Sequence, residues 1–374
     1  MKRVIVIPDS FKGTMSSSEV CRTMESAIHE INSAIEVITI PVADGGEGSV
    51  EAFLKALRGE KVYCKVTGPF FEEMEAVYGR LEQDTAVVEM AACSGLPLVE
   101  GREDPMLTTT YGVGELMLDA IEKGAKKLIV GLGGSCTNDG GVGAAAALGA
   151  RFYNTKGETF IPTGGTLKDI VRIDIETCRE KLKGIEIITM CDIDNPLYGK
   201  QGAAYIFGPQ KGADEKMVEV LDNGLRHLQE VIQNALKIDV SVLKGAGAAG
   251  GMGAGMVAFL GSKLQMGIET VLDVVGFEEL LEGTDLVFTG EGKIDAQSLS
   301  GKVVMGVAKR AKSKGVPVMV LVGAIGEGIE PIYDEGVTAI FSINRAPIPF
   351  EEARDQSVEN LYFMMKNVMK VIER

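Results

Sequence analysis

Carboxylates stand at four places where short apolar runs, typical of buried strands, give way to turns. The four groups are Asp9, Asp44 with Glu47, Asp192 with Asp194, and Glu291 with Asp295. A single carboxylate at a strand end is explained by capping or turn formation. Ligands of open α/β sheets bind beyond the carboxyl ends of the strands, so four such ends together favour a site. Converging carboxylates repel one another, which indicates a divalent cation, proton transfer or the hydroxyl groups of a polar substrate.

Histidine chemistry is not expected. The two histidines, His29 and His227, both fall in predicted helices away from any glycine turn. Ser-His-Asp hydrolysis and histidine-rich metal sites therefore lose support. Chemistry then falls to carboxylates and lysines. With a magnesium ion and the backbone amides of glycine loops, these groups suit phosphoryl transfer to a hydroxyl, where catalysis is largely positioning and charge stabilisation.

A glycine-rich turn, residues 131–141, follows the predicted strand 128–130 and leads into an alanine-rich helix. It contains two glycine pairs and two hydroxyl side chains, and the helix is expected to begin near Asn138 or Asp139. Free N–H groups and the positive end of the helix dipole would then lie at the carboxyl edge of a sheet, which favours phosphate binding. A structural left-handed turn capped by Asn138 is the alternative.

A second glycine cluster, residues 245–255, has the spacing G-x-G-x-x-G at Gly245, Gly247 and Gly250. This spacing is typical of dinucleotide-binding folds. The preceding stretch 239–243 is a doubtful strand and follows a long predicted helix, so close helix packing or a phosphate-cradling loop is favoured over an NAD site. No Gly-Lys pair is followed by Ser or Thr, which excludes a Walker-type P-loop.

Composition indicates a globular protein of two domains, because 374 residues exceed the size at which single cores usually stop growing. The formal charge of −15 argues against nucleic acid as a partner. The first apolar run is too short for a signal segment, and no run approaches the roughly 20 apolar residues of a membrane span. We therefore expect a cytoplasmic protein. Its 6 cysteines have no C-x-x-C spacing and are expected to be reduced, structural thiols.

Both ends of the chain show the β-α-β-α pattern of a parallel sheet, and Ser16 with Glu19 predicts a capping box for the first helix. Residues 61–90 alternate in a way that predicts antiparallel strands. Helices are expected over residues 111–123, from an N-cap at Asp214 to about residue 236, and from the second glycine cluster through about residue 275. The predicted fold class is α/β, with two domains. Residues 1–61 and 290–374 form a parallel-sheet domain, residues 62–289 form an inserted mixed α/β domain, and the active site lies in the interdomain cleft.

Seven blocks together resemble the bacterial glycerate kinase type-1 family, and the resemblance runs through nearly the whole chain. The blocks cover residues 9–14, 41–48, 131–141, 191–197, 207–213, 247–253 and 289–298. Cys136 is the one small departure, since a small residue such as Ala is expected there. The resemblance implies ATP-dependent phosphorylation of D-glycerate, with the 2-hydroxyl as the expected acceptor, with Mg²⁺, in a two-domain α/β protein. A homodimer is left open.

Roles follow from our own interpretation of the residues. We expect Asp192, or else Asp295, to be the base, because each directly ends an apolar strand, and Lys12 or Lys293 to hold a charged group. The expected substrate-binding residues are Asp9, Ser10, Asp44, Glu47 and Asn195. The expected ATP-binding residues are Gly133, Gly134, Ser135, Thr137, Asn138, Gly250 and Gly251, and Asp194 and Glu291 are the expected metal ligands. An NAD-dependent oxidoreductase and a non-catalytic small-anion-binding protein are the alternative functions.

Overall fold

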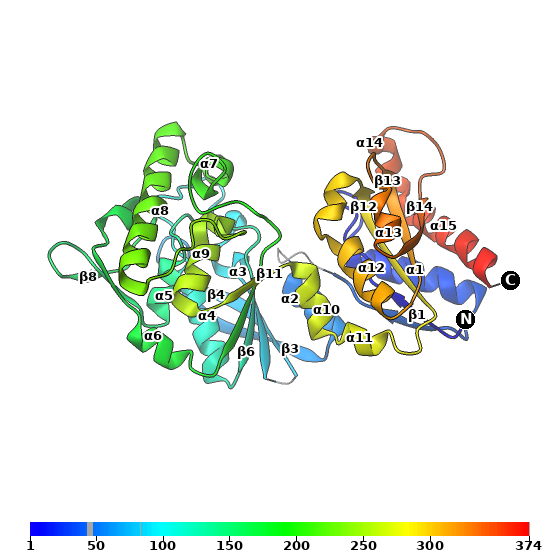
Figure 1. Cartoon of the computed structure of the whole chain (residues 1–374), viewed down its shortest axis with the longest axis horizontal. Coiled ribbons are helices and arrows are strands. Elements are labelled where there is room, and N and C mark those ends of the chain that lie inside the picture. Colours follow the sequence, from blue (N-terminus) through cyan, green and yellow to red (C-terminus); the bar gives the residue numbers. More distant parts are fainter. Residues whose placement is uncertain (43–47, 83, 374) are drawn as a thin grey trace. The chain divides into compact units, whose positions relative to one another are not determined.

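The computed structural model describes residues 1–42, 48–82 and 84–373. The chain divides into two compact units, each with its own sheet (Figure 1). The first, here called the terminal unit, comprises Met1–Asp44, Lys55–Leu57 and Ile268–Arg374, and the second, the central unit, comprises Gly45–Leu54 and Arg58–Gly267.

The terminal unit contains a five-stranded sheet in which all pairings are parallel. Its strand order is β14 (Val337–Ser342), β13 (Val318–Ile325), β12 (Leu286–Ile294), β1 (Arg3–Val6) and β2 (Glu36–Thr39). Counted within the unit, this is the doubly wound order 2-1-3-4-5, and the direction of winding reverses between β1 and β12. Such a switch point leaves a crevice at the carboxyl ends of the two strands, where ligands bind in folds of this type.

Helix α1 (Ser17–Ile31) begins with the predicted capping box. The Ser16 N–H donates to Glu19 Oε2 at 2.8 Å, and the Glu19 N–H donates to Ser16 Oγ at 3.3 Å. The apolar face of α1 packs with the apolar face of α15 (Ser357–Ile372) in one core cluster beneath β1 and β12. The other helices of the unit are α10 (Gly267–Val274, which begins at the unit boundary), α11 (Phe277–Leu280), α12 (Val303–Ser313), α13 (Pro331–Asp334), α14 (Phe350–Ala353) and the 3-10 turns η4 (Ala296–Ser300) and η5 (Arg354–Gln356).

The central unit contains a six-stranded mixed sheet. Its order is β11 (Lys263–Gln265), β10 (Glu186–Met190), β6 (Lys127–Gly131), β5 (Thr85–Glu89), β4 (Glu73–Leu81) and β3 (Gly59–Thr67). The pairings are parallel from β11 to β5 and antiparallel from β5 to β3. The alternating sequence pattern at residues 61–90 thus predicted the antiparallel strands correctly.

Most helices of the central unit contribute residues to one large core cluster. The helices of this unit are α2 (Ser49–Ala56, whose last two residues belong to the terminal unit), α3 (Ala91–Ser94), α4 (Tyr111–Glu122), α5 (Val142–Ala147), α6 (Glu176–Lys181), α7 (Ala203–Phe207), α8 (Glu215–Leu236), α9 (Ala248–Leu260) and the 3-10 turns η1 (Leu96–Val99), η2 (Gly164–Asp169) and η3 (Pro209–Lys211). A small antiparallel sheet of β7 (Arg151–Tyr153), β8 (Thr159–Phe160) and β9 (Arg172–Asp174) was not predicted.

Three predicted boundaries are wrong. The helix expected to run through residue 275 ends at Leu260, because Gly261 takes a left-handed conformation with φ 66°, and β11 and α10 follow. The helix expected near Asn138 begins at Val142. The return to the first domain, expected at residue 290, lies inside β12, whose residues 286–288 already pair with β1. The contacts place that return after Gly267.

Candidate active site

Asp9 and Glu291 lie at the switch point of the terminal sheet. The Ile7 N–H donates to the Phe288 carbonyl at 2.8 Å and the Asp9 N–H to the Gly290 carbonyl at 2.8 Å, so the chain leaving β1 stays beside β12. Asp9 Oδ1 accepts the N–H of Ser10 at 2.6 Å. Glu291 is the next residue of β12 after Gly290. The structure therefore brings together two of the predicted strand-end groups.

Glu291 is a buried carboxylate, 6% exposed. Burial raises its pKa, as do the negative charges of Asp9 and Asp295, while the Ser298 hydroxyl and Lys302 oppose the rise. Within the described part of the chain, Glu291 Oε1 has no hydrogen-bond partner. A buried acceptor without a donor is unfavourable unless a cation or a donor from a ligand reaches it. The donor atom and its acidic neighbours suit Mg²⁺, which binds through one or two carboxylates together with substrate phosphates.

Two predicted lysines lie on the same edge. Lys293 forms an ion pair with Asp295, with Nζ 3.1 Å from Oδ2, and its side chain is 62% exposed. The Lys12 side chain is exposed on the loop after β1. A Cβ on Gly292 would lie 3.2 Å from the backbone nitrogen of Lys12, so the glycine allows this loop to approach β12 closely. Asp44 and Glu47 were predicted to join this group but lie outside the described residues.

In the turn after β6 of the central unit, Gly134 is exposed and Gly133 is half-buried. Gly134 has φ 72°, and its carbonyl accepts the Leu96 N–H at 2.9 Å. The Cys136 N–H donates to the Ser94 carbonyl at 2.9 Å, which ties the turn to α3. The N–H groups of Gly133 and Gly134 find no acceptor among the residues that the structure describes. Two adjacent free amides in a glycine turn suit an anion.

The N-terminus of α5 is not open to a ligand, contrary to the prediction. The buried Asp139 carboxylate accepts the N–H of Gly141 at 3.0 Å and of Gly143 at 3.3 Å. It also accepts the N–H and hydroxyl of Thr110 at 2.9 and 2.8 Å. Burial raises the pKa of Asp139, and these donors oppose the rise. The exposed turn before Ser135, and not the helix start, is therefore the part of this loop that a ligand can reach.

Thr137 and Asn138 are fully buried. In the described part of the chain, Thr137 Oγ1 and both polar side-chain atoms of Asn138 lack partners. Helix α9 packs against them: a Cβ on Gly250 would lie 2.0 Å from the Thr137 carbonyl oxygen, and the Gly140 N–H donates to the Gly250 carbonyl at 3.0 Å. Gly250 and Gly251 have φ of 67° and 88°. These glycines thus allow helix packing, and their contact with ATP stays a prediction.

The structure does not support an NAD site at the second glycine cluster. Residues 239–243 form no strand, so the second glycine cluster does not follow one as a dinucleotide-binding turn requires.

Asp192 is exposed just beyond β10, and its Oδ1 accepts the Gly267 N–H at 2.8 Å. Asp194 is 74% exposed and pairs with Lys244 at 3.0 Å. Asn195 is fixed structurally, because its Nδ2 donates to the Gln201 carbonyl at 2.8 Å. Since β10 pairs with β6, the predicted base and the glycine turn after β6 share the carboxyl edge of the central sheet.

Sequence reasoning missed Lys211. It is 2% exposed, and its Nζ donates to Ser135 Oγ and to the Thr137 carbonyl, both at 2.7 Å. Burial lowers its pKa to about 8, and Cys136 and Asp139 oppose that shift. The only sequence signal was its place inside the block 207–213, because nothing local shows that this lysine is buried.

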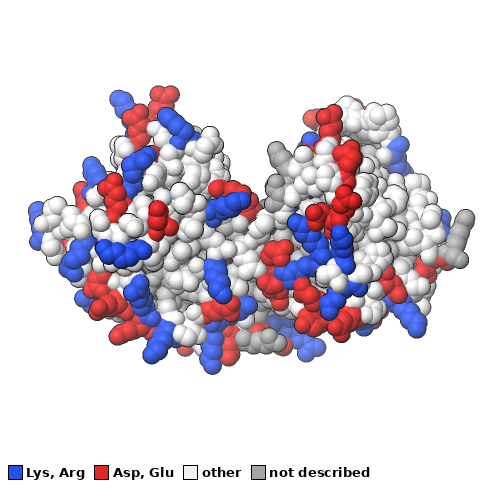
Figure 2. All heavy atoms as spheres, in the orientation of Figure 1, with Lys and Arg blue, Asp and Glu red and all other residues white. Residues whose placement is uncertain are grey.

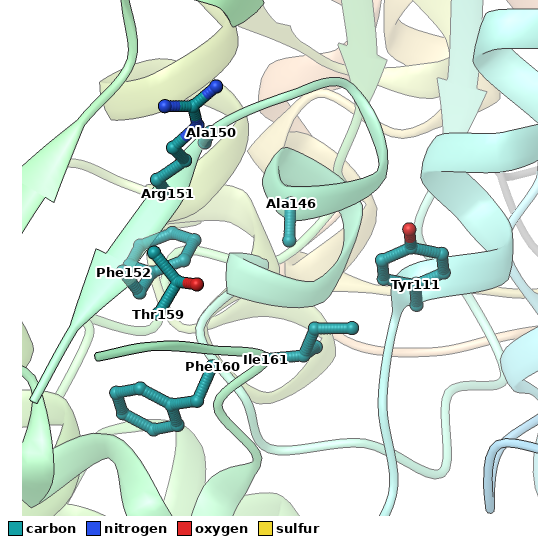
Figure 3. Close-up of a pocket in the computed structure, with 8 residues that line it drawn as sticks. All are labelled: Tyr111, Ala146, Ala150, Arg151, Phe152, Thr159, Phe160 and Ile161. Atoms are coloured by element: carbon teal, nitrogen blue, oxygen red, sulfur yellow. The ribbon is translucent and has the colours of Figure 1, made fainter.

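A hollow of about 380 Å³ lies elsewhere on the central unit, between the ends of α4 and α5 and strands β7 and β8 (Figure 3). None of the predicted site residues lines it. Its walls are formed by Tyr111, Ala146, Ala150, Arg151, Phe152, Thr159, Phe160 and Ile161.

Among residues 1–42, 48–82 and 84–373, no three His, Cys, Asp or Glu side chains come together as a ready metal site. The helices in this part of the chain include none with the length and apolar character of a membrane span. On the face shown in Figure 2, Lys and Arg are interspersed with Asp and Glu, without a continuous basic tract in view. The six cysteines are free, and four of them are buried, as expected for structural thiols.

The sequence model described as the Glycerate kinase family matches residues 4–373. The chain belongs to this family. It is 45% identical over 371 residues to a glycerate kinase of Bacillus cereus, covering 99% of this chain and 97% of that protein. It is 44% identical to the glycerate 2-kinase of Escherichia coli, covering 98% of this chain and 97% of that protein. As a member of this family, the chain is an enzyme, a phosphotransferase.

The fold has a solved counterpart. The crystal structure of a Salmonella typhimurium LT2 protein assigned as glycerate kinase 2 matches with a TM-score of 0.87 and 40% identity, covering 100% of this chain and 98% of that one. The α/β fold with one parallel and one mixed sheet therefore agrees with that of the family.

Proposed function

We propose that this enzyme transfers the γ-phosphoryl group of ATP to the 2-hydroxyl of D-glycerate, giving 2-phosphoglycerate and ADP. Family membership supports the reaction class, and the E. coli relative supports the 2-hydroxyl. The structural observation that carries the proposal is the placement of carboxylates and a glycine turn at the carboxyl ends of parallel strands in both sheets. Those edges are where ligands of α/β proteins bind.

Asp192 is the proposed base for the attacking hydroxyl. Its carboxylate is exposed at the end of β10 and needs no rearrangement of the core to meet a substrate. A general base must come within hydrogen-bond reach of the proton that it accepts. Asp295 is the second choice, because its ion pair with Lys293 ties up one of its oxygens.

The carboxyl edge of the sheet in the terminal unit is the proposed glycerate site. Lys12 or Lys293 would hold the carboxylate of glycerate or the transferred phosphate. Lys12 lies on the loop after β1 and Lys293 lies near the end of β12, the two strands of the switch point, and both side chains are exposed. Asp9 and Ser10 would bind the hydroxyl groups. Asn195 of the central unit, Asp44 and Glu47 are further candidates for binding glycerate.

Glu291 is the proposed Mg²⁺ ligand, because its buried Oε1 lacks a donor within the described residues. When bound, Mg²⁺ would neutralise charge on the phosphates and so stabilise the transition state. Asp194 is the weaker candidate, since it is largely exposed and already paired with Lys244.

ATP phosphates would lie on the glycine turn of the central unit. The amides of Gly133 and Gly134 and the hydroxyl of Ser135 are the proposed contacts. Thr137, Asn138, Gly250 and Gly251 would support the turn from behind, since they are buried. We further propose that water is excluded from the reacting groups during transfer.

The variant Asp192→Asn tests the role of the base, because the amide oxygen can still accept the Gly267 N–H. We expect kcat to fall about 10²- to 10⁴-fold, the usual contribution of a general base, with ATP and glycerate binding retained. The matched control is Asp174→Asn, which alters a carboxylate that accepts the Glu176 N–H at 3.1 Å outside the candidate site. Near-full turnover by Asp192→Asn would rule out this assignment.

A further inference from the structure

Lys211 places a buried cation behind the proposed phosphate turn. It ends the 3-10 turn η3, and Gly212 follows with φ 93°. A Cβ on Gly212 would lie 2.5 Å from the Glu103 carbonyl oxygen, so this glycine lets η3 pack tightly against the loop that carries Glu103. The side chain is thereby fixed with 2% of its surface exposed.

The hydrogen bonds of Lys211 have a defined direction. An ammonium group has donors and no acceptor. In the 2.7 Å contact, Ser135 Oγ is therefore the acceptor, and the proton of its hydroxyl must point to another acceptor. Ser135 is 6% exposed and directly follows the exposed Gly134. The hydroxyl is thus prepared to donate toward a ligand on the turn.

The second bond of Lys211 fixes the same loop. Its Nζ donates to the Thr137 carbonyl at 2.7 Å, so one ammonium spans residues 135–137 from below. Burying a charge is unfavourable unless it is paired. The titratable groups that face it are Asp139, which already accepts four hydrogen bonds, and the Cys136 thiol; Glu103 lies next to Gly212 and Glu72 lies near Cys136. An anion on the turn would be a further partner for the cation.

We propose that Lys211 is a positioning residue for ATP: it holds Ser135 Oγ as an acceptor, so that the hydroxyl donates to a phosphate oxygen, and it supplies positive charge beneath the turn. This inference rests on the proposed function, in which ATP phosphates occupy residues 133–135. The role differs from a structural one, because it predicts an effect on ATP that is not shared by glycerate.

The test compares Lys211→Met, Ser135→Ala and the double variant with the full-length protein. We expect Lys211→Met to weaken ATP binding about 10- to 100-fold in titration calorimetry, the range for a charged hydrogen-bond partner, while KM for D-glycerate changes less than about 3-fold. The double variant should bind ATP about as weakly as Lys211→Met, because the two residues act together. The exposed Lys216→Met in α8 is the control and should bind ATP normally. Equal losses for ATP and glycerate, or additive losses in the double variant, would overturn the proposal.

A second measurement does not depend on the folding of Lys211→Met. Since burial lowers the pKa of Lys211 to about 8, the affinity of the wild-type protein for ATP should fall as pH rises through 8. The change between pH 7 and pH 9.5 should be at least about 5-fold, and KM for D-glycerate should not follow it. A flat ATP affinity over this range would contradict the proposal. Calorimetry with ATP alone gives this answer even if the wild-type protein forms no ADP, an outcome that would refute the proposed function separately.

Discussion

The buried ammonium of Lys211 should reduce stability at neutral pH. Its pKa is lowered from 10.5 to about 8, so the unfolded chain holds the proton more tightly than the folded chain does. This destabilisation is fully present below pH 8 and is relieved as pH rises from 8 toward 10.5. Relative to Lys211→Met, the free energy of unfolding of the wild type should rise by about 2 kcal/mol between pH 7 and pH 9.5. Urea denaturation of both proteins at the two pH values measures this difference. An equal change of the free energy of unfolding in wild type and Lys211→Met would contradict the prediction.

Glu291 is expected to matter for metal dependence more than for folding. The variant Glu291→Gln removes a buried carboxylate whose pKa is raised by burial and by the nearby acids. Without ATP or Mg²⁺ the variant should be at least as stable as wild type at pH 7, because a charge unfavourable in the folded state is gone. Its Mg²⁺ concentration for half-maximal activity should rise at least about tenfold, since few protein carboxylates hold the ion.

The control for that change is Glu352→Gln, which alters an exposed carboxylate of α14. Metal titrations of the two variants, together with thermal unfolding in a chelator, separate the effects. Unchanged Mg²⁺ dependence in Glu291→Gln would remove this residue from the metal site.

At this scale the sequence predicts residues whose chemistry depends on local order. Asp9, Glu291 and Asp295 were found because apolar strands end beside them. Lys211 was not, since its burial depends on contacts with Ser135, which lies 76 positions away in the chain. The role of Asp139 was missed for the same reason: its hydroxyl partner is Thr110, 29 positions away.

At the scale of elements, the packing of α9 on the glycine turn should be intolerant of a side chain. A Cβ on Gly250 would meet the Thr137 carbonyl oxygen at 2.0 Å, and the residue has φ 67°. The control Gly184→Ala shares a positive φ of 81° but has open space within 4 Å. We expect Gly250→Ala to lose at least about 3 kcal/mol of unfolding free energy and Gly184→Ala about 1 kcal/mol, as measured by urea denaturation. Equal losses would show that backbone strain alone decides the effect.

Arg310 holds α10 and α11 onto α12. Its guanidinium binds Glu269 at 2.5 Å, Asp273 at 2.7 Å and Glu278 at 2.9 Å and is 17% exposed. The three carboxylates are 37–43% exposed, so losing their common partner should cost less than breaking a fully buried pair. We expect Arg310→Ala to cost about 2 kcal/mol and to speed hydrogen exchange over residues 268–281.

The neighbouring Lys309→Ala is the control for Arg310. It removes an exposed ion pair of 4.0 Å with Glu335 and should cost less than about 1 kcal/mol. Equal effects of the two substitutions on thermal unfolding would contradict the structural role given to Arg310.

Elements were predicted well where one local signal dominates. The capping box of Ser16 and the N-cap of α8 at Asp214 are examples, since both signals act within three residues. The break at Gly261 was missed because a glycine inside a long apolar stretch reads as part of a helix. The small sheet of β7, β8 and β9 was missed because strands of two or three residues have no measurable period.

At the scale of the whole molecule, strand order adds what the sequence lacked. The chain suggested a parallel sheet built from both termini, and the pairing of β1 with β12 places the reversal of winding where Asp9 and Glu291 meet. That meeting joins residues 282 positions apart and follows from topology, which no local pattern contains. The misplaced return at residue 290 has the same origin, because only strand pairing shows that β12 begins at Leu286.

The central claim is the reaction itself. Incubation of the full-length chain with ATP, D-glycerate and saturating Mg²⁺, followed by phosphorus NMR, tests it most directly. We predict equal amounts of ADP and 2-phosphoglycerate, with no ADP formed when glycerate is omitted. Absence of any phosphorylated product would contradict the proposed function, and formation of 3-phosphoglycerate would contradict the assignment of the 2-hydroxyl.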